Sequence, residues 1–340
     1  MATCAVIGGC GFLGRRLAEM LLEQGYSVNV FDIQQTFEHE KMRFFNGNLC
    51  NKQDLLPALR NTDVVFHTAS PSAASDNREL FERVNVDGMR VVIDACREAG
   101  VEKLVVTSTA SVIYDGSDIM NATEDSPYAK RPMDYYTETK IKQEKVVLGA
   151  NSSEDNFFTI AIRPHGIFGP RDQQMLPNVV KAARAGKMKF IVGNGMNLVD
   201  QTYVDNVVHG HIVAAKSLGE GSHTAGKAYH ITNDSPVFFW TFLSSLLTGL
   251  GYATPHHHVP YFIVYVIAVL LAACKRVLSP LYDVGELTFT PSRVALIATH
   301  HFYSCEAAKR DLGYRPLVPM NEAIERTLES FTHLRNNVVT

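Results

Sequence analysis

The sequence lacks the patterns that mark several classes of protein. Its six cysteines form no Cys-x-x-Cys pair and no cluster with histidine, so we expect no metal site and a reducing compartment around the catalytic part. The 32 Lys and Arg and the 35 Asp and Glu are spread along the chain, so we expect no nucleic acid as a partner. We also expect no signal peptide, because a strand-like run begins near Thr3.

Length and composition allow an ordinary folded enzyme. A chain of 340 residues with 46% apolar side chains can bury one large or two ordinary cores without disulfide bonds. The informative part of the sequence is therefore its motifs.

A glycine-rich turn lies close to the amino terminus. The apolar run Cys4 to Ile7 leads into Gly8, Gly11 and Gly14, and an apolar helical pattern follows. Glycines permit a tight turn, and the start of a helix offers free N–H groups to a pyrophosphate. Two registers of the pattern overlap here, so an ordinary glycine turn before a helix remains an alternative at this point.

An acidic residue ends the next predicted strand. Ser27 to Phe31 has the composition of a strand, and Asp32 follows it at about the twenty-residue distance typical of an acid that binds the adenosine ribose. No arginine among residues 33–35 would accept a 2′-phosphate. The sequence therefore favours NAD over NADP.

Strand and helix patterns alternate beyond Asp32. This alternation predicts an α/β fold of the Rossmann type, with a doubly wound parallel sheet whose ligand lies at the carboxyl ends of the strands. The predicted strands are Met42 to Phe45, Val64 to His67, Lys103 to Thr107 and Phe157 to Ile162, and the predicted helices are Asp54 to Arg60, Asn77 to Ala99 and Tyr136 to Leu148.

Candidate catalytic residues occur after the fifth predicted strand and on the next long helix. Tyr136 and Lys140 are four residues apart, so they share one face of a helix, and an ammonium there could lower the pKa of the phenol. Thr109 is the first candidate for a hydroxyl that orients the substrate, and Ser108 is the second. Tyr135 has Thr139 four residues on and serves as an internal control.

These motifs, in this order, resemble the extended short-chain dehydrogenases/reductases and, within them, the 3β-hydroxysteroid dehydrogenase family. The resemblance covers nearly the whole chain and implies Thr109, Tyr136 and Lys140 as catalytic residues. Where the family usually has Asp, this chain has Asn48, and where it often has Tyr, this chain has Phe168. The residues implied to bind the cofactor are Gly8, Gly11, Phe12, Leu13, Gly14, Asp32, Asn48, Leu49, Thr68 and Ala69, together with Tyr136 and Lys140.

The resemblance also implies an activity. Within the family the chain is most similar to members that use NAD to oxidise the 3β-hydroxyl of a 4α-carboxysterol to a ketone, with loss of CO2. A 3β-hydroxysteroid dehydrogenase/isomerase and a sugar-nucleotide enzyme are alternatives among enzymes, and a non-catalytic NAD-binding scaffold is an alternative of another class. The expected organisation is a NAD-binding domain over residues 1–165, to which about 198–216 return, and a mainly substrate-binding region over 166–340.

An uncharged apolar run occupies residues 259–274 and is followed by Lys275 and Arg276. Its sixteen residues would span about 24 Å as a helix, short of a hydrocarbon core of about 30 Å. We expect it to insert into one leaflet. The resemblance implies the cytosolic face of the endoplasmic reticulum membrane and lipid droplets, a sterol substrate and a homodimer. The aromatic run Val237 to Leu243 fits either a sterol pocket or an amphipathic core helix.

Overall fold

The computed structural model describes residues 2–72, 75, 77–278 and 290–336. Its larger part is a seven-stranded parallel sheet in the order β12-β7-β5-β4-β1-β2-β3. This confirms the predicted doubly wound α/β fold. The strands are β1 (Thr3–Ile7), β2 (Ser27–Asp32), β3 (Met42–Asn46), β4 (Val64–His67), β5 (Lys103–Thr107), β7 (Phe158–Pro164) and β12 (Lys227–Ile231).

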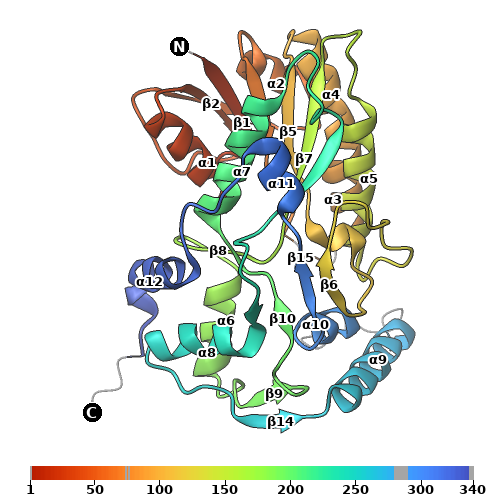
Figure 1. Cartoon of the computed structure of the whole chain (residues 1–340), viewed down its shortest axis with the longest axis vertical. Coiled ribbons are helices and arrows are strands. Elements are labelled where there is room, and N and C mark those ends of the chain that lie inside the picture. The colour runs from red at the N-terminus through yellow and green to blue at the C-terminus, as the bar shows by residue number, and fades with distance from the viewer. Residues whose placement is uncertain (1, 73–74, 76, 279–289, 337–340) are drawn as a thin grey trace.

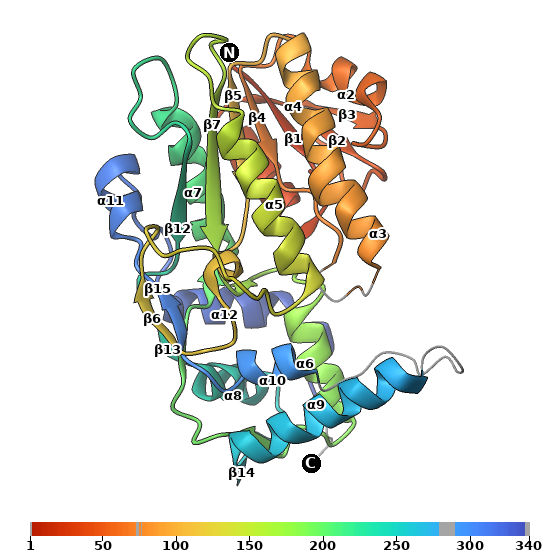
Figure 2. The same ribbon diagram turned by 90° about the vertical axis from the view of Figure 1, so that its right-hand side faces the viewer.

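Helices cover both faces of this sheet (Figures 1 and 2). The alternation of side chains along β1 shows why: Cys4 and Val6 enter the core beneath α1 and α7, whereas Ala5 and Ile7 enter the core beneath α2 and α4. Such strands must be apolar on both faces. The helices of this part are α1 (Phe12–Glu23), α2 (Lys52–Leu59), α3 (Arg78–Phe81), α4 (Gly88–Glu98), α5 (Tyr135–Gly149) and α7 (Val204–Ser217).

The predicted helix from Asn77 to Ala99 is interrupted. Between α3 and α4 the chain forms a π-helical segment, Glu82–Asp87. Asn85 in this segment is fully buried, and its amide donates to Thr139 Oγ1 (3.1 Å) and accepts from Ser70 Oγ (3.2 Å). An extra residue in the turn directs this polar side chain inward, and π-helical turns occur often at functional sites.

The smaller part lies beyond the carboxyl ends of the sheet strands, toward which the arrow of β7 points in Figure 2. Its strands form small sheets, β13-β10-β15-β6, β11-β8 and β14-β9. Its elements are β6 (Ile119–Ala122), β8 (Ile167–Phe168), α6 (Met175–Arg184), β9 (Phe190–Val192), β10 (Leu198–Val199), β11 (Thr202–Tyr203), β13 (Val237–Phe238), α8 (Phe239–Gly249), β14 (His257–Val259), α9 (Tyr261–Leu278), α10 (Pro291–Leu296), β15 (His301–Tyr303) and α12 (Met320–Ser330). Between β15 and α12, helix α11 (Glu306–Leu312) returns to the larger part and packs against β12 and α7.

Two segments of the predicted substrate region have other roles. The sequence predicts that residues of about 198–216 return to the NAD-binding part. In the structure a later segment returns as well, because β12 pairs in parallel with β7 and forms one edge of the large sheet. The aromatic run from Val237 to Leu243 forms β13 and the start of α8, and Trp240 and Phe242 are buried in the core. Of the two interpretations, a sterol pocket or an amphipathic core helix, the core helix is therefore correct for these two rings.

Candidate active site

The glycine turn connects β1 to α1. Gly8 has φ +80°, and a Cβ atom there would lie 2.6 Å from the backbone nitrogen of Ala69. A Cβ atom at Gly14 would lie 2.1 Å from the carbonyl oxygen of Gly8. Gly11 is the N-cap of α1 and supplies no side chain to the helix terminus. The turn therefore forms an open backbone cradle with helix N–H groups at its edge, which suits a pyrophosphate.

Asp32 lies at the end of β2, beside this turn. Its carboxylate accepts hydrogen bonds from the backbone N–H groups of Cys10 (2.9 Å) and Ile33 (2.7 Å). It borders a cavity of about 580 Å³ that is also lined by Gly8, Gly11, Asn48, Leu49, Thr68 and Ala69. The structure thus brings these predicted adenosine-side residues together around one space.

A second cavity, of about 470 Å³, joins the glycine turn to the predicted catalytic residues. Its wall shares Gly8, Gly11 and Thr68 with the first cavity, so the two form one elongated groove at the carboxyl ends of the strands. The other predicted site residues on its wall are Phe12, Leu13, Gly14, Ser108, Thr109, Tyr136 and Lys140. A dinucleotide fits this groove because the glycine cradle, the predicted ribose-binding acid Asp32 and the predicted catalytic side chains follow one another along it.

Tyr136 and Thr109 form the reactive end of the groove. Asp134 caps α5 by accepting from the N–H of Thr137 (2.8 Å), which fixes the start of the helix that carries Tyr136. The Tyr136 phenol and Thr109 line the same part of the groove. Burial raises the pKa of Tyr136 above its ordinary value, and the Asp134 carboxylate adds to this, while the nearby Thr109 hydroxyl opposes it.

Lys140 lies one turn further along α5. Its ammonium donates to the carbonyl oxygen of Thr107 (2.8 Å) and to Gln143 Oε1 (2.8 Å). Burial lowers the pKa of Lys140 to about 7. Burial therefore outweighs the effect expected of Lys140 on the phenol: it raises the pKa of Tyr136 and disfavours the charged form of Lys140.

The structure distinguishes the two candidate hydroxyls. Thr109 accepts from the N–H of Ser111 (3.2 Å) and lies near enough to the phenol to act on its pKa. Ser108 instead donates to the buried carboxylate of Glu144. Both line the groove, but the Ser108 hydroxyl is directed to Glu144, which leaves Thr109 as the hydroxyl beside Tyr136.

Several groove residues were not among those predicted from the sequence to bind the cofactor or to take part in catalysis. The wall beside the reactive end includes Ser70, Pro164, Gly166, Gln173 and Met175. Gly166 and Met175 follow the short turns that enter the smaller part, so no helix or strand pattern could have indicated them as site residues.

Glu144 was not predicted either. It lies four residues after Lys140, and this spacing on one helix face could have indicated it.

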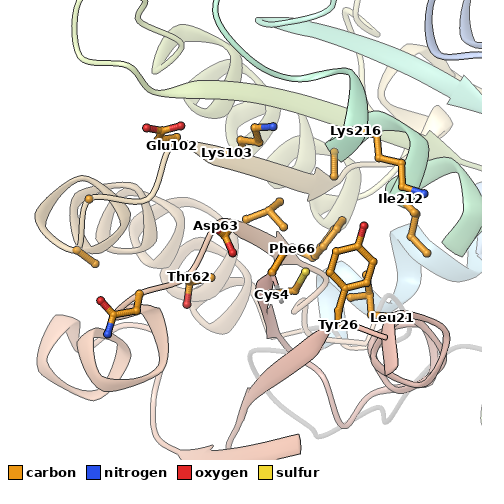
Figure 3. Close-up of a pocket in the computed structure, with 16 residues that line it drawn as sticks. Cys4, Leu21, Tyr26, Thr62, Asp63, Phe66, Glu102, Lys103, Ile212 and Lys216 are labelled. Atoms are coloured by element: carbon orange, nitrogen blue, oxygen red, sulfur yellow. The ribbon is translucent and has the colours of Figure 1, made fainter. Parts of the chain in front are cut away.

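Another cavity, of about 670 Å³, opens at the amino ends of the sheet strands (Figure 3). Cys4, Leu21 and Phe66 form its apolar floor, and Asp63 and Lys103 lie at its rim. Ligands of doubly wound sheets bind at the carboxyl ends of the strands, whereas this cavity is at the amino ends. The groove at the glycine turn is therefore the candidate active site.

The chain is similar to a known family over most of its length. The model of the 3-beta hydroxysteroid dehydrogenase/isomerase family matches residues 5–261. The chain is 60% identical to the sterol-4-alpha-carboxylate 3-dehydrogenase, decarboxylating, of Mus musculus, over 98% of this chain and 92% of the relative. The protein of the same name from Homo sapiens is also 60% identical, over 98% of this chain and 89% of the relative.

The fold has solved counterparts. The dTDP-glucose 4,6-dehydratase of Bacillus anthracis, solved in complex with NAD, superposes with a TM-score of 0.73 at 18% identity, over 98% of this chain and 97% of that one. At this identity the likeness concerns the fold. The family match and the two relatives confirm the resemblance seen in the motifs, and the chain belongs to the 3-beta hydroxysteroid dehydrogenase/isomerase family.

Proposed function

We propose that this chain catalyses the NAD-dependent oxidation of the 3β-hydroxyl of a 4α-carboxysterol to the 3-ketone, with loss of CO2, during C4 demethylation in sterol (cholesterol) biosynthesis. The observation that carries the proposal is that Thr109, Tyr136 and Lys140 line one end of a groove whose other end holds the glycine cradle and Asp32. The two relatives at 60% identity have names that specify this substrate class and decarboxylation.

Each residue has a defined task in the reaction. The substrate hydroxyl lies between Tyr136 and Thr109: Thr109 orients it, and Tyr136 Oη takes its proton as the C3–H bond breaks. When bound, NAD accepts the hydride from C3. Lys140, in its charged form, stabilises the phenolate that must exist before proton transfer. Asp32 favours NAD, since its carboxylate would repel a 2′-phosphate.

Loss of CO2 follows from the oxidation. The product is a β-keto acid, in which the new ketone accepts the electron pair of the breaking bond between C4 and the carboxyl carbon. The ketone oxygen would then lie against the hydroxyl groups of Tyr136 and Thr109, which donate hydrogen bonds to the developing enolate. A proton added at C4 completes the reaction.

Turnover by the purified protein tests this proposal. The chain is incubated with NAD and a 4α-carboxysterol labelled in its carboxyl carbon, and NADH and labelled CO2 are measured together. Equal amounts of both, absent with Tyr136→Phe, are expected. Conversion of a Δ5-3β-hydroxysteroid to the isomerised ketone, without turnover of the carboxysterol, would instead identify a dehydrogenase/isomerase.

We also propose that α9 holds the enzyme on the cytosolic face of the endoplasmic reticulum membrane and on lipid droplets. This helix has 18 residues and is long and apolar enough to cross a membrane, but only 6% of it is buried in the protein. It extends past the predicted end at residue 274 to Leu278. An apolar helix surface of this kind, exposed to water, marks an interaction site.

The burial pattern of α9 supports insertion into one leaflet. Tyr261, Val264 and Tyr265 pack against the protein core, and Ala268 is fully buried, so one narrow side of the helix follows the domain. The rest of the helix, represented by Phe262 at 73% exposure, faces outward. A helix attached along its side to a folded domain lies in the membrane plane. Figures 1 and 2 show α9 at the end of the molecule farthest from the amino ends of the sheet strands.

A further inference from the structure

Three side chains on successive turns of α5 lie beside three consecutive residues at and just after the end of β5. Tyr136 lies near Thr109, and Lys140 donates to the carbonyl oxygen of Thr107. The third, Glu144, accepts a hydrogen bond from the hydroxyl of Ser108, between the other two. The spacing of four residues places all three side chains on one helix face. Glu144 therefore belongs to the same row as the two catalytic candidates.

Glu144 is held from three sides. Arg163, on the neighbouring strand β7, donates to it through Nε (3.0 Å) and Nη2 (2.5 Å). The Tyr128 hydroxyl also donates to it (2.8 Å). The side chains of Glu144 and Arg163 are 0% and 5% exposed. Charge-assisted hydrogen bonds in a buried setting are strong, so Glu144 holds Ser108, and with it the adjacent Thr109, in a fixed place.

Glu144 also acts on Lys140 through its charge. Lys140 is 2% exposed, and its burial favours the neutral amine, while the Glu144 carboxylate one turn away favours the ammonium. The other groups facing Lys140 do not supply a negative charge: Gln143 and the Thr107 carbonyl are neutral, and burial together with Lys140 lowers the pKa of His67 on β4 to about 3.

We propose that Glu144 is a positioning residue of this reaction, which fixes the Ser108–Thr109 segment beneath the substrate hydroxyl and keeps the buried Lys140 in its charged form. The inference rests on the proposed function for its kinetic consequences. The effect of Glu144 on the charge of Lys140 does not depend on any substrate. The inference about Glu144 and the proposed function can therefore fail separately.

The first test measures the charge of Lys140 directly. In protein with isotope-labelled lysine and no ligand, NMR follows the Lys140 resonance against pH, assigned by its absence from Lys140→Arg. Glu144→Gln should lower the pKa of Lys140 by roughly one unit, because a carboxylate is lost and the Arg163 charge is left unbalanced. Tyr128→Phe is the matched control: it removes one hydrogen bond to Glu144 but no charge, and should leave the titration in place.

The second test measures turnover between pH 6 and pH 8. The activity of Glu144→Gln, relative to that of the unchanged protein, should fall as the pH rises, since Lys140 becomes neutral at a lower pH in this variant. Ser108→Ala keeps the charge and should lose activity by the same factor at each pH. Tyr128→Phe should stay within about twofold of the unchanged protein, as expected for the loss of one of several hydrogen bonds.

Breaking a buried ion pair can unfold a protein. If Glu144→Gln does not fold, Glu144→Gln/Arg163→Met removes both charges and is measured instead, and the pKa of Lys140 should still fall. An unchanged Lys140 titration, with a loss of activity that is equal at every pH and parallels the loss of thermal stability, would overturn the inference. If Glu144→Gln lowers the pKa of Lys140 as expected but the unchanged protein does not turn over the carboxysterol, the effect of Glu144 on Lys140 is supported and the proposed function is refuted.

Discussion

Gly14 packs against the carbonyl oxygen of Gly8, and a Cβ atom at Gly14 would lie 2.1 Å from that oxygen. No side chain fits between them, so the backbone of the turn would have to move. We expect Gly14→Ala to cost about 1–3 kcal/mol of stability, the range for overpacking, and to weaken NAD binding at least tenfold.

Thermal unfolding and NAD titration measure this effect. Gly149→Ala is the matched control, because Gly149 lies at the exposed end of α5 with nothing within 4 Å of its added Cβ. It should keep NAD affinity and gain up to about 1 kcal/mol of stability from helix propensity. Unchanged NAD affinity in Gly14→Ala would show that the glycine turn does not bind NAD.

Tyr136→Phe should reduce turnover by about 10²–10⁴-fold, the usual contribution of a general base. The ring remains to pack against Phe81, with centroids 5.9 Å apart, so NAD should still bind. Tyr135→Phe should stay close to the unchanged rate, since the Tyr135 hydroxyl donates to Glu82 (2.9 Å) away from the reactive end. Near-normal turnover by Tyr136→Phe at saturating substrate would refute its role.

Asp32→Asn should narrow the preference for NAD over NADP. The amide keeps an oxygen that can accept from the Cys10 N–H, so the turn should hold, but the charge that repels a 2′-phosphate is lost. The ratio of kcat/KM for the two cofactors is the measurement, and a fall of about tenfold corresponds to 1.4 kcal/mol. An unmodified enzyme that uses both cofactors equally well would contradict the assignment.

Lysines at Val266 and Val269 should weaken binding of the protein to microsomes and lipid droplets, because charges in hydrocarbon are costly. Both residues are on the exposed part of α9, so the fold and the Tyr136 site should survive. Met120→Lys, at a residue 63% exposed on β6, controls for added charge. Flotation of the protein with vesicles measures the change.

Protease protection of sealed microsomes decides how α9 lies. A tag after Thr340 should be digested without detergent if α9 enters one leaflet from the cytosolic side. A tag that stays protected until detergent is added would show that the chain crosses the membrane.

Stability should fall as the pH is lowered from about 6.5. Burial lowers the pKa of His67 and His230 to about 3 and that of His211 to about 4. The unfolded chain then binds protons that the folded chain does not, and each such histidine costs about 1.4 kcal/mol per pH unit between its unfolded and folded pKa values. Asp200, whose pKa burial raises to about 7, binds a proton only when folded and offsets one of them.

Urea unfolding at pH 5.0 and pH 6.5 measures this dependence. His211→Gln should make it shallower by about one proton. A stability that is constant across this range would show that the folded chain binds as many protons as the unfolded chain, which would contradict the lowered pKa values of the buried histidines.

Local pattern determined much of this protein. The run from Cys4 to Gly14 specifies strand, turn and helix within one short segment, and Asp32 ends the apolar run that forms the next strand. The spacing of Tyr136 and Lys140 placed them on one helix face before any tertiary contact was known. These features depend on neighbours a few residues apart, so the sequence contains them.

Tertiary structure decided what depends on distant segments. That Ser108 is bonded to Glu144, and that Thr109 lies near Tyr136, follows from the packing of α5 on β5. The same packing buries Lys140 and so opposes its charge, which helical spacing alone could not show. The apolar composition of α9 gave no orientation either: only its contact with the domain along Ala268 separates the packed side from the exposed one, because burial is a property of what approaches a helix and not of the helix itself.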